Sequence, residues 1–305
     1  MTTGQLPAFP DFVRLDISHR GLIDDALTME QPEVSELNFG EIFAWSGGRQ
    51  TQITDLDGAL CLFLVRHGKR CFLPPLGAQD YPSTMRRLLL WLREQGEEGF
   101  VYGLTGRQAE EAEAAGGFEI EEDLDNADYV YTTQDLIHLP GHRYDGKRNH
   151  IHNFVRGYDF TYAALDVRMV AEVIDFQRRW FVERGRPDLP GLAAENQAML
   201  DLLQHFDDLP VMGAVIRIDG RIQAYTVAAE LNRHTAMVIA EKANPAMRGL
   251  YQAINQMFCE KRLAGYTWVN REQDAGDPGL RRAKLSYLPH HMVAKYRVRL
   301  SNPSS

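Results

Sequence analysis

The sequence predicts an α+β fold in which two similar domains follow one another along the chain. Amphipathic helical segments alternate with short apolar runs typical of strands, and tight turns join several of these runs. The order of segments in residues 1–140 recurs, more clearly, in residues 141–305. A chain of 305 residues is long enough for two domains of ordinary size. We therefore expect an N-terminal domain at 1–140 and a C-terminal domain at 141–305.

The composition is that of a globular, cytoplasmic protein. Hydrophobic residues make up 44% of the chain and charged residues 25%. The formal net charge of -9 argues against binding to DNA or to nucleic acids in general, although a local basic cluster can still bind phosphates. The N-terminus lacks the pattern of a secretory signal, and no apolar run is long enough to cross a bilayer. The three cysteines have no metal-binding spacing, so we expect no metal.

The first half of the chain combines helices with a mainly antiparallel sheet. Residues 59–65 form a nearly continuous apolar run, which is typical of a strand buried on both faces. His67 and Gly68 then turn the chain into a second strand at 70–73. Residues 81–95 carry apolar side chains on one face and predict an amphipathic helix. The other expected elements are helices at 18–28 and 107–115, a strand containing Phe39, Ile42, Ala44 and Trp45, and strands at 99–104, 118–122 and 128–133.

The second half repeats this arrangement with a clearer pattern. Asp219 and Gly220 form a favoured hairpin turn between two expected strands. The expected order is helices at 166–184 and 192–206, strands at 211–218, 222–231 and 235–240, a helix at 250–263, a strand at 266–269, a short helix and a last strand at 291–300. This order is that of a GNAT-type acyltransferase domain. We therefore expect two tandem GNAT-like (acyl-CoA N-acyltransferase) domains, each a mainly antiparallel mixed sheet flanked by helices.

The stretch 270–289, which follows an expected strand, contains the densest group of candidate site residues. Its sequence, NREQDAGDPGLRRAKLSYLP, places charges of both signs around turn-forming glycines. Loops positioned by a strand end often carry function, although a charge-dense turn is commonly an ion-paired surface structure. Asn270, Glu272 and Asp274 alternate along an extended segment and would bind an ammonium group or an amide. We assign Glu272 and Asp274 to catalysis.

Basic and aromatic residues that follow extend this expected site in the C-terminal domain. Arg281 and Lys284 lie three residues apart on one helix face, which suits a carboxylate or a phosphate. Tyr287 would protonate a leaving thiolate or ribose oxygen. Lys295, on the expected last strand, would stabilise an oxyanion. The alternative for Arg281 and Lys284 is ion pairing along the surface of the helix.

The turn before the helix at 250–263 is a candidate anion site. It contains Asn244, Arg248 and Gly249. Exposed backbone N–H groups and the helix dipole attract anions at such a place. In a GNAT fold this turn holds the pyrophosphate of coenzyme A, so coenzyme A or an acyl-CoA is the cofactor to consider. A capped helix start with one solvated arginine is the alternative.

A locally basic segment, 142–156, is a second candidate. Lys147, Arg148 and Asn149 in this segment would suit the phosphates of a lipid head group, a nucleotide or the end of a tRNA. Its histidines lack a nearby carboxylate pattern, so we interpret them as surface or packing residues rather than metal ligands. Glu241 and Glu230 are weaker candidates for a base that accepts a proton from an attacking amine.

Three of these motifs carry a resemblance to a known family. KRNHIHNF (147–154), NREQDAGDPGLRRAKLSYLP (270–289) and AKYRV (294–298) resemble an uncharacterised bacterial family related to the C-terminal domain of phosphatidylglycerol lysyltransferase. This resemblance implies a tandem GNAT fold similar to that of the Fem-type aminoacyltransferases, which move an aminoacyl group from tRNA to a lipid or peptide acceptor. Because the sequence shows no membrane-spanning segment, a flippase role is not expected.

We therefore expect an acyl- or aminoacyl-transferase whose donor is either an acyl-CoA or an aminoacyl-tRNA. The acceptor would be an amine or a hydroxyl, such as the head group of a phosphatidylglycerol-like lipid. The alternative is a non-catalytic sensor that binds coenzyme A or a phospholipid head group in the same cleft. A weaker alternative is that the acidic surface binds a protein partner.

Overall fold

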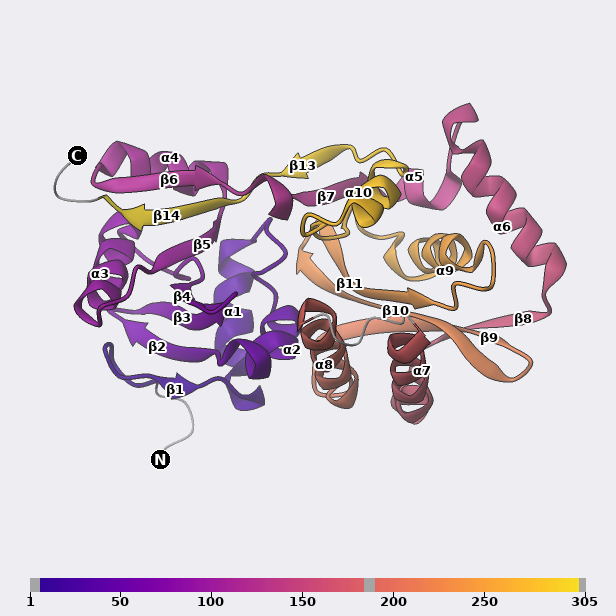
Figure 1. Ribbon diagram of the computed structural model, residues 1–305, viewed down its shortest axis with the longest axis horizontal. Coiled ribbons are helices and arrows are strands. Elements are labelled where there is room, and N and C mark those ends of the chain that lie inside the picture. The colour runs from indigo at the N-terminus through magenta and orange to yellow at the C-terminus, as the bar shows by residue number, and fades with distance from the viewer. Residues whose placement is uncertain (1–5, 184–189, 302–305) are drawn as a thin grey trace. The chain divides into compact units, whose positions relative to one another are not determined.

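The structure is a computed structural model that describes residues 6–183 and 190–301. The chain forms two compact units. The first contains the chain up to Asp128 and again from Val293, and the second contains Tyr129–Met292. Among the described residues, each unit has one seven-stranded sheet with helices packed against it (Figure 1). The expected α+β class is therefore confirmed.

The sheet of the first unit has the strand order β1-β2-β3-β4-β5-β14-β6. Neighbouring strands are antiparallel except for β4 and β5, which run parallel. The strands are β1 (Val13–Arg14), β2 (Gln52–Leu56), β3 (Ala59–Arg66), β4 (Lys69–Phe72), β5 (Phe100–Leu104), β14 (Tyr296–Leu300) and β6 (Phe118–Glu122). The α-helices are α1 (Arg20–Glu30), α2 (Phe39–Arg49), α3 (Tyr81–Glu94) and α4 (Gly106–Ala115).

Helix α3 forms where the sequence predicts it, and local chemistry explains its limits. Asp80 caps the helix because its side chain accepts a hydrogen bond from the backbone N–H of Ser83, at 3.0 Å. Pro82 lies in the first turn, where no backbone N–H is needed. The apolar face is buried against the sheet and comprises Met85, Leu88, Leu89 and Leu92. Burial of each such side chain contributes about 1.5–3 kcal/mol.

The strand expected around Phe39 is wrong, because this segment forms helix α2. The side chain of Asn38 accepts hydrogen bonds from the backbone N–H groups of Gly40 and Glu41, which starts a helix. Phe39 and Ile42 are three residues apart and are both buried on one side of this helix. The bulky residues of the segment therefore follow a helical period, and the cap decides between helix and strand.

The sheet of the second unit has the strand order β13-β7-β12-β11-β10-β9-β8. The pairs β8–β9, β9–β10 and β10–β11 are antiparallel. The pair β11–β12 is parallel, and the pair β12–β7 is antiparallel. The strands are β13 (His291–Val293), β7 (Asp128–Thr132), β12 (Trp268–Asn270), β11 (Thr235–Ala243), β10 (Arg221–Asn232), β9 (Val211–Ile218) and β8 (Phe160–Ala164). The α-helices are α5 (Thr133–His138), α6 (Asp145–Gly157), α7 (Val170–Glu183), α8 (Pro190–Gln204), α9 (Leu250–Phe258) and α10 (Pro278–Leu285).

Each sheet contains one strand that sequence order would place in the other unit. Strand β7 follows β6 in the chain but lies between β12 and β13, and β14 follows β13 but lies between β5 and β6. The limits of the units therefore differ from the expected division at 140/141, and the last strand belongs to the first unit. The partner of a strand is set by non-local pairing, which the pattern along the chain does not encode.

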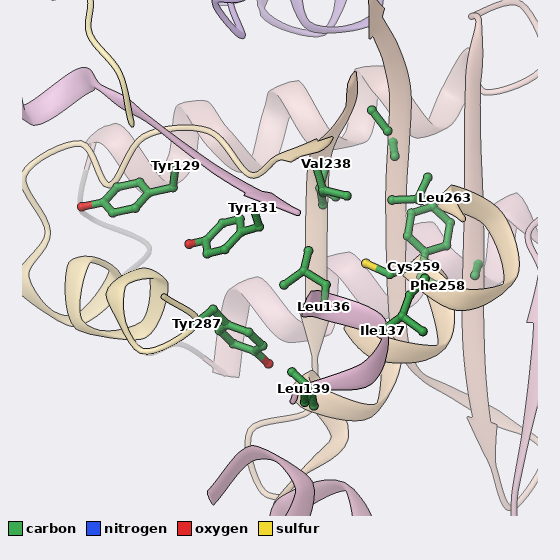
Figure 2. Packing of buried hydrophobic residues seen from close by; sticks show 14 of the residues in the cluster. Tyr129, Tyr131, Leu136, Ile137, Leu139, Val238, Phe258, Cys259, Leu263 and Tyr287 are labelled. Atoms are coloured by element: carbon green, nitrogen blue, oxygen red, sulfur yellow. The ribbon is translucent and has the colours of Figure 1, made fainter. Parts of the chain in front are cut away.

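The core of the second unit joins β7, β11, α5 and the segment after α10. Tyr131, Leu136, Val238, Phe258 and Tyr287 are among its buried residues (Figure 2). The rings of Tyr131 and Tyr287 meet edge to face, with centroids 6.4 Å apart. This contact brings the end of the charged stretch, 270–289, into the interior beside β11.

Candidate functional site

The parallel strands β11 and β12 part near the middle of the second sheet. Their pairing runs from Thr235 opposite Trp268 to Met237 opposite Asn270 and ends there. Strand β11 continues to Ala243 without β12 beside it. Side chains from the chain beyond Asn270 can therefore approach residues 238–243 of β11. This divergence is the place where the second unit collects buried charges.

Glu241, Arg271 and Asn255 form a largely buried polar cluster at the divergence, in which the Arg271 and Glu241 side chains are 14% and 10% exposed. An Arg271 Nη2–Glu241 Oε1 ion pair of 3.0 Å links β11 to the residue after β12. The side-chain amide of Asn255, on α9, donates to the other carboxylate oxygen of Glu241 at 3.0 Å. Two buried atoms of this cluster, Arg271 Nη1 and Asn255 Oδ1, have no hydrogen-bond partner in the part of the chain that the structure describes. Unpartnered buried polar atoms are costly and need an explanation, and a catalytic role is one such explanation.

Tyr287 lies between two cations of this site. The Arg271 guanidinium is 4.9 Å from the centroid of the Tyr287 ring, and the ammonium nitrogen of Lys147 is 4.2 Å from it. Lys147, on α6, also donates a hydrogen bond of 2.6 Å to the hydroxyl of Ser286 at the end of α10. Burial raises the pKa of Tyr287 well above its ordinary value, so the phenol stays neutral and is a weaker proton donor than expected.

Asp274 is the anchor of the loop before α10 rather than an open catalytic carboxylate. Arg281 donates two hydrogen bonds to it, of 2.8 and 2.9 Å, and Tyr129 donates one of 2.5 Å. The backbone N–H of Gly276 donates another, at 2.9 Å. The Arg281 hydrogen bonds are the main cause that holds the pKa of Asp274 at about 2, against the effect of its burial. The structure therefore supports the alternative of ion pairing for Arg281, with Asp274 as its partner.

Lys284 points its ammonium group into the same loop. It donates to the backbone carbonyl oxygens of Arg271, Glu272 and Gln273, at 2.6, 2.9 and 2.5 Å. These bonds hold a loop in which Glu272 has a left-handed backbone with φ of 57°, and Asn270 accepts a hydrogen bond from the Glu272 N–H at 2.7 Å. Such backbone conformations persist where the surroundings enforce them. Lys284 thus orients the loop that presents Arg271, instead of binding a carboxylate or phosphate as expected.

Lys295 lies outside this site, which corrects the expected oxyanion role in the second domain. It precedes β14 and is fully buried in the first unit. Its ammonium group is 2.7 Å from Asp128 and 2.7 Å from Glu36, and it donates to Ser35 at 3.0 Å. Because β14 joins the first sheet, Lys295 becomes part of a structural ion cluster there.

The turn before α9 does not form an open cradle for the pyrophosphate of coenzyme A. The side chain of Asn244 bonds to Gln223 and to the backbone of its own turn, and Arg248 bonds to His150 on α6 at 3.2 Å. Gly249, with φ of 91°, is covered by α6: a Cβ added there would lie 2.2 Å from the carbonyl oxygen of His150. We therefore derive no step through coenzyme A.

The basic segment 142–156 forms helix α6, and its three candidate residues differ in role. Lys147 reaches the site, as described above. Arg148 bonds to the carbonyl oxygens of Leu139 and Gly141 and to Asp145, so it ties α6 to the end of α5. Asn149 is exposed. Of the two glutamates considered as bases, Glu241 belongs to the site, whereas Glu230 accepts a hydrogen bond from Tyr266 at an exposed place.

The sequence reasoning missed Arg271, Asn255 and Ser286 as site residues. Arg271 lies inside the recognised stretch, but its partner Glu241 is 30 residues away on another strand. Asn255 is a polar residue that is 2% exposed on the apolar face of α9, and this position was a signal that could have identified it. Nothing in the local pattern singles out Ser286.

The described residues contain no helix that has both the length and the apolar character needed to cross a bilayer. No group of three or more His, Cys, Asp or Glu side chains among them is placed to hold a metal ion.

Comparison with known proteins identifies the family. The family described as "Phosphatidylglycerol lysyltransferase, C-terminal" matches residues 29–299. A curated, uncharacterised protein of Mycoplasmoides gallisepticum is 21% identical over 203 residues, which cover 66% of this chain and 65% of that protein. The match thus spans just under two thirds of the relative's length.

Solved structures show the same fold. A conserved protein of unknown function from Bacteroides thetaiotaomicron VPI-5482 is 28% identical with a TM-score of 0.89, covering 95% of this chain and 99% of that one. L-PGS from Bacillus licheniformis is 15% identical with a TM-score of 0.66, covering 99% and 95%. A tandem GNAT protein from the clavulanic acid biosynthesis pathway is 11% identical with a TM-score of 0.50, covering 97% and 99%. The expected tandem GNAT-like fold is therefore confirmed, and the chain belongs to the phosphatidylglycerol lysyltransferase C-terminal family.

Proposed function

We propose that the protein transfers an aminoacyl or other acyl group from an activated donor to an amine or a hydroxyl. Membership of the family supports a transferase of this general kind. The observation that carries the proposal is the buried Glu241–Arg271 pair at the divergence of β11 and β12, with Lys147 and Ser286 beside it. Charged groups that are buried together at such a strand divergence are suited to stabilising charge during a reaction.

Arg271 would bind the carbonyl oxygen of the transferred group. Its Nη1 is a buried donor without a partner among the described residues, while Nη2 is held by Glu241. When the acceptor attacks the carbonyl carbon, negative charge develops on the carbonyl oxygen, and a fixed cationic donor stabilises it. The bond between the carbonyl carbon and the leaving oxygen then breaks. Asn255 and Glu241 keep the guanidinium in place, because both are bonded within the cluster.

An aminoacyl ester, such as aminoacyl-tRNA, is the donor that we propose ahead of acyl-CoA. The engagement of Asn244 and Arg248 with other side chains, and the packing of α6 over Gly249, support this preference. The family description supports a lipid head group, of the phosphatidylglycerol kind, as one acceptor to test. Soluble amines are the other acceptor class.

The proposal is tested by measuring transfer directly. The purified protein is incubated with a pool of radiolabelled aminoacyl-tRNAs or with acetyl-CoA, in the presence of phosphatidylglycerol vesicles or of soluble primary amines. We expect label in an acceptor with the aminoacyl donors, and a loss of about 100-fold or more in Arg271→Met. Arg282→Met, an exposed arginine of α10, is the matched control and should stay within about twofold of the wild type.

Two outcomes would contradict the proposal. Full transfer by Arg271→Met would exclude Arg271 from the reaction. Retention of a donor or of the vesicles without any turnover would instead support the alternative of a head-group or coenzyme A sensor.

A further inference from the structure

Lys147 differs from the other lysines of the second unit in having an uncharged hydroxyl as its partner. Its ammonium nitrogen donates to the Ser286 hydroxyl at 2.6 Å. By contrast, Lys242 pairs with Glu195, and Lys284 is bound by three backbone carbonyl oxygens. Among the residues that the structure describes, no carboxylate lies within ion-pair distance of Lys147. A half-buried lysine without a counter-ion is unusual, because its charge is neither fully hydrated nor neutralised.

Burial and the nearby Arg271 charge disfavour the protonated form of Lys147, whereas its contacts with the Tyr287 ring and the Ser286 hydroxyl favour it. Arg271, from the segment after β12, and Lys147 both lie over the ring of Tyr287, which comes from the segment after α10. Arg271 Nη2 also forms an ion pair of 3.0 Å with Glu241 Oε1. On α6 itself, Arg148 is paired with Asp145. Burial, and then the Arg271 charge, lower the pKa of Lys147 below its ordinary value.

The contacts form a continuous path from the buried pair to the surface. Glu241 bonds to Arg271, the Arg271 guanidinium lies over the Tyr287 ring, Lys147 lies over the same ring, and Lys147 bonds to Ser286. Ser286 is exposed at the end of α10. Lys147 thus lies one side chain away from Arg271 and is bonded to an exposed residue.

We infer that Lys147 is the general base of the transfer reaction, a role that goes beyond the phosphate contact suggested by its sequence. The inference rests on the proposed function. Neutral Lys147 would take the proton of the acceptor amine or hydroxyl as the acceptor's nitrogen or oxygen bonds to the carbonyl carbon. The carbon–oxygen ester bond then breaks, and the Lys147 ammonium returns the proton to the leaving oxygen. Lys147 ends as the neutral amine, so protons and charge balance over one turnover.

The decisive variant is Lys147→Arg, because it separates a base from a binding cation. Arginine keeps the positive charge but is not deprotonated in proteins, so it can bind an anion and cannot accept a proton. We expect a loss of about 100-fold or more in kcat, with KM for the donor little changed. The wild-type rate should rise with pH until Lys147 is deprotonated, and this dependence should vanish in the variant. Lys261→Arg is the matched control, since Lys261 is exposed and also lies near a tyrosine ring, at 5.8 Å.

A rate and pH profile that are unchanged in Lys147→Arg, combined with a raised KM in Lys147→Met, would overturn the inference. That result would make Lys147 a binding cation.

A second measurement does not require activity, so it separates this inference from the proposed function. The chain has six lysines, and reductive methylation with ¹³C-formaldehyde labels those that the reagent reaches, with the Lys147 NMR signal assigned by its absence in Lys147→Arg. We expect Lys147 to titrate at lower pH than an ordinary lysine side chain, and its pKa to rise in Arg271→Met. If the protein shows no transfer but Lys147 titrates early, the basic amine is supported and only the proposed reaction fails. Titration of Lys147 at the pH of an ordinary lysine side chain would overturn the inference whatever the activity.

Discussion

Glu41 in the first unit should make stability depend on pH in a direction opposite to that of most carboxylates. Its side chain is 6% exposed, and the nearest cation, Arg49, is 3.8 Å away. Burial is the main cause that raises the pKa of Glu41 to about 7 from an ordinary 4.5. The folded state therefore binds this proton more tightly than the unfolded state does. Its contribution to the free energy of unfolding is complete below pH 4.5 and is lost as the pH rises to about 7.

The magnitude follows from the size of the shift. A change from 4.5 to about 7 corresponds to about 3 kcal/mol between the two states, since one pKa unit is about 1.4 kcal/mol. The substitution Glu41→Gln keeps the shape of the side chain and removes the titration. The free energy of unfolding of the variant, relative to that of the wild type, should therefore be about 2–3 kcal/mol higher at pH 8 than at pH 5, because part of the wild-type contribution is already lost at pH 5. The nearby Glu36 does not titrate between pH 5 and pH 8. Burial raises the pKa of Glu36, but Lys295 and Arg66 outweigh it and hold the pKa at about 2.

The assay is urea unfolding of both proteins at pH 5 and pH 8, followed by tryptophan fluorescence. Other titrating groups cancel in the difference between variant and wild type at each pH. If the two units unfold in separate transitions, the transition of the second unit is an internal control and should not move. A variant whose relative stability is the same at both pH values, within about 1 kcal/mol, would refute the reasoning about Glu41.

Three further predictions concern the interior of each unit. Gly249→Ala should destabilise the second unit by about 2 kcal/mol or more in urea unfolding, because of its positive φ and the α6 backbone against it, whereas Gly157→Ala, which meets no atom within 4 Å, should be neutral or better. Lys295→Met should cost the first unit about 3–5 kcal/mol, and the double variant with Asp128→Leu should recover part of this loss; no recovery would mean that the ion pair is not the cause. Lys284→Met should lower kcat of the proposed transfer and increase hydrogen exchange in residues 271–273, and unaltered exchange there would remove Lys284 from its orienting role.

The fold could be predicted from the sequence wherever local pattern and packing agree. The amphipathic period of α3 and the hairpin turn at Asp219 and Gly220 each act within a few residues, and both elements formed as expected. The prediction of a strand in the segment of α2 was wrong. Bulky residues favour strands, but the cap at Asn38 favours a helix here. The sheets that β7 and β14 join could not be predicted, because nothing near these strands in the sequence specifies their partners.

The same distinction applies to the site. The stretch 270–289 could be recognised by its density of charge and turn residues, but density does not say which charges pair with each other. Arg281 with Asp274 satisfies a local pattern seven residues apart, whereas Arg271 with Glu241 requires the parallel pairing of β11 and β12. Lys295 was assigned to the wrong unit for the same reason as its strand.

The pairing of charges also determines which of them remain available for a substrate. Asp274 and Arg281 neutralise each other, and Lys284 is bound to the backbone, so these residues shape the loop. Arg271 has Nη2 paired with Glu241 and a buried Nη1 without a partner in the described chain, and Lys147 contacts the Ser286 hydroxyl and the Tyr287 ring but no carboxylate of the described residues. Once Lys147 has taken the proton of the acceptor, Glu241, Arg271 and Lys147 together carry a net positive charge. Such a site favours the oxyanion that forms on a carbonyl during acyl transfer and lowers the proton affinity of the lysine beside it, so one arrangement would serve both parts of the reaction.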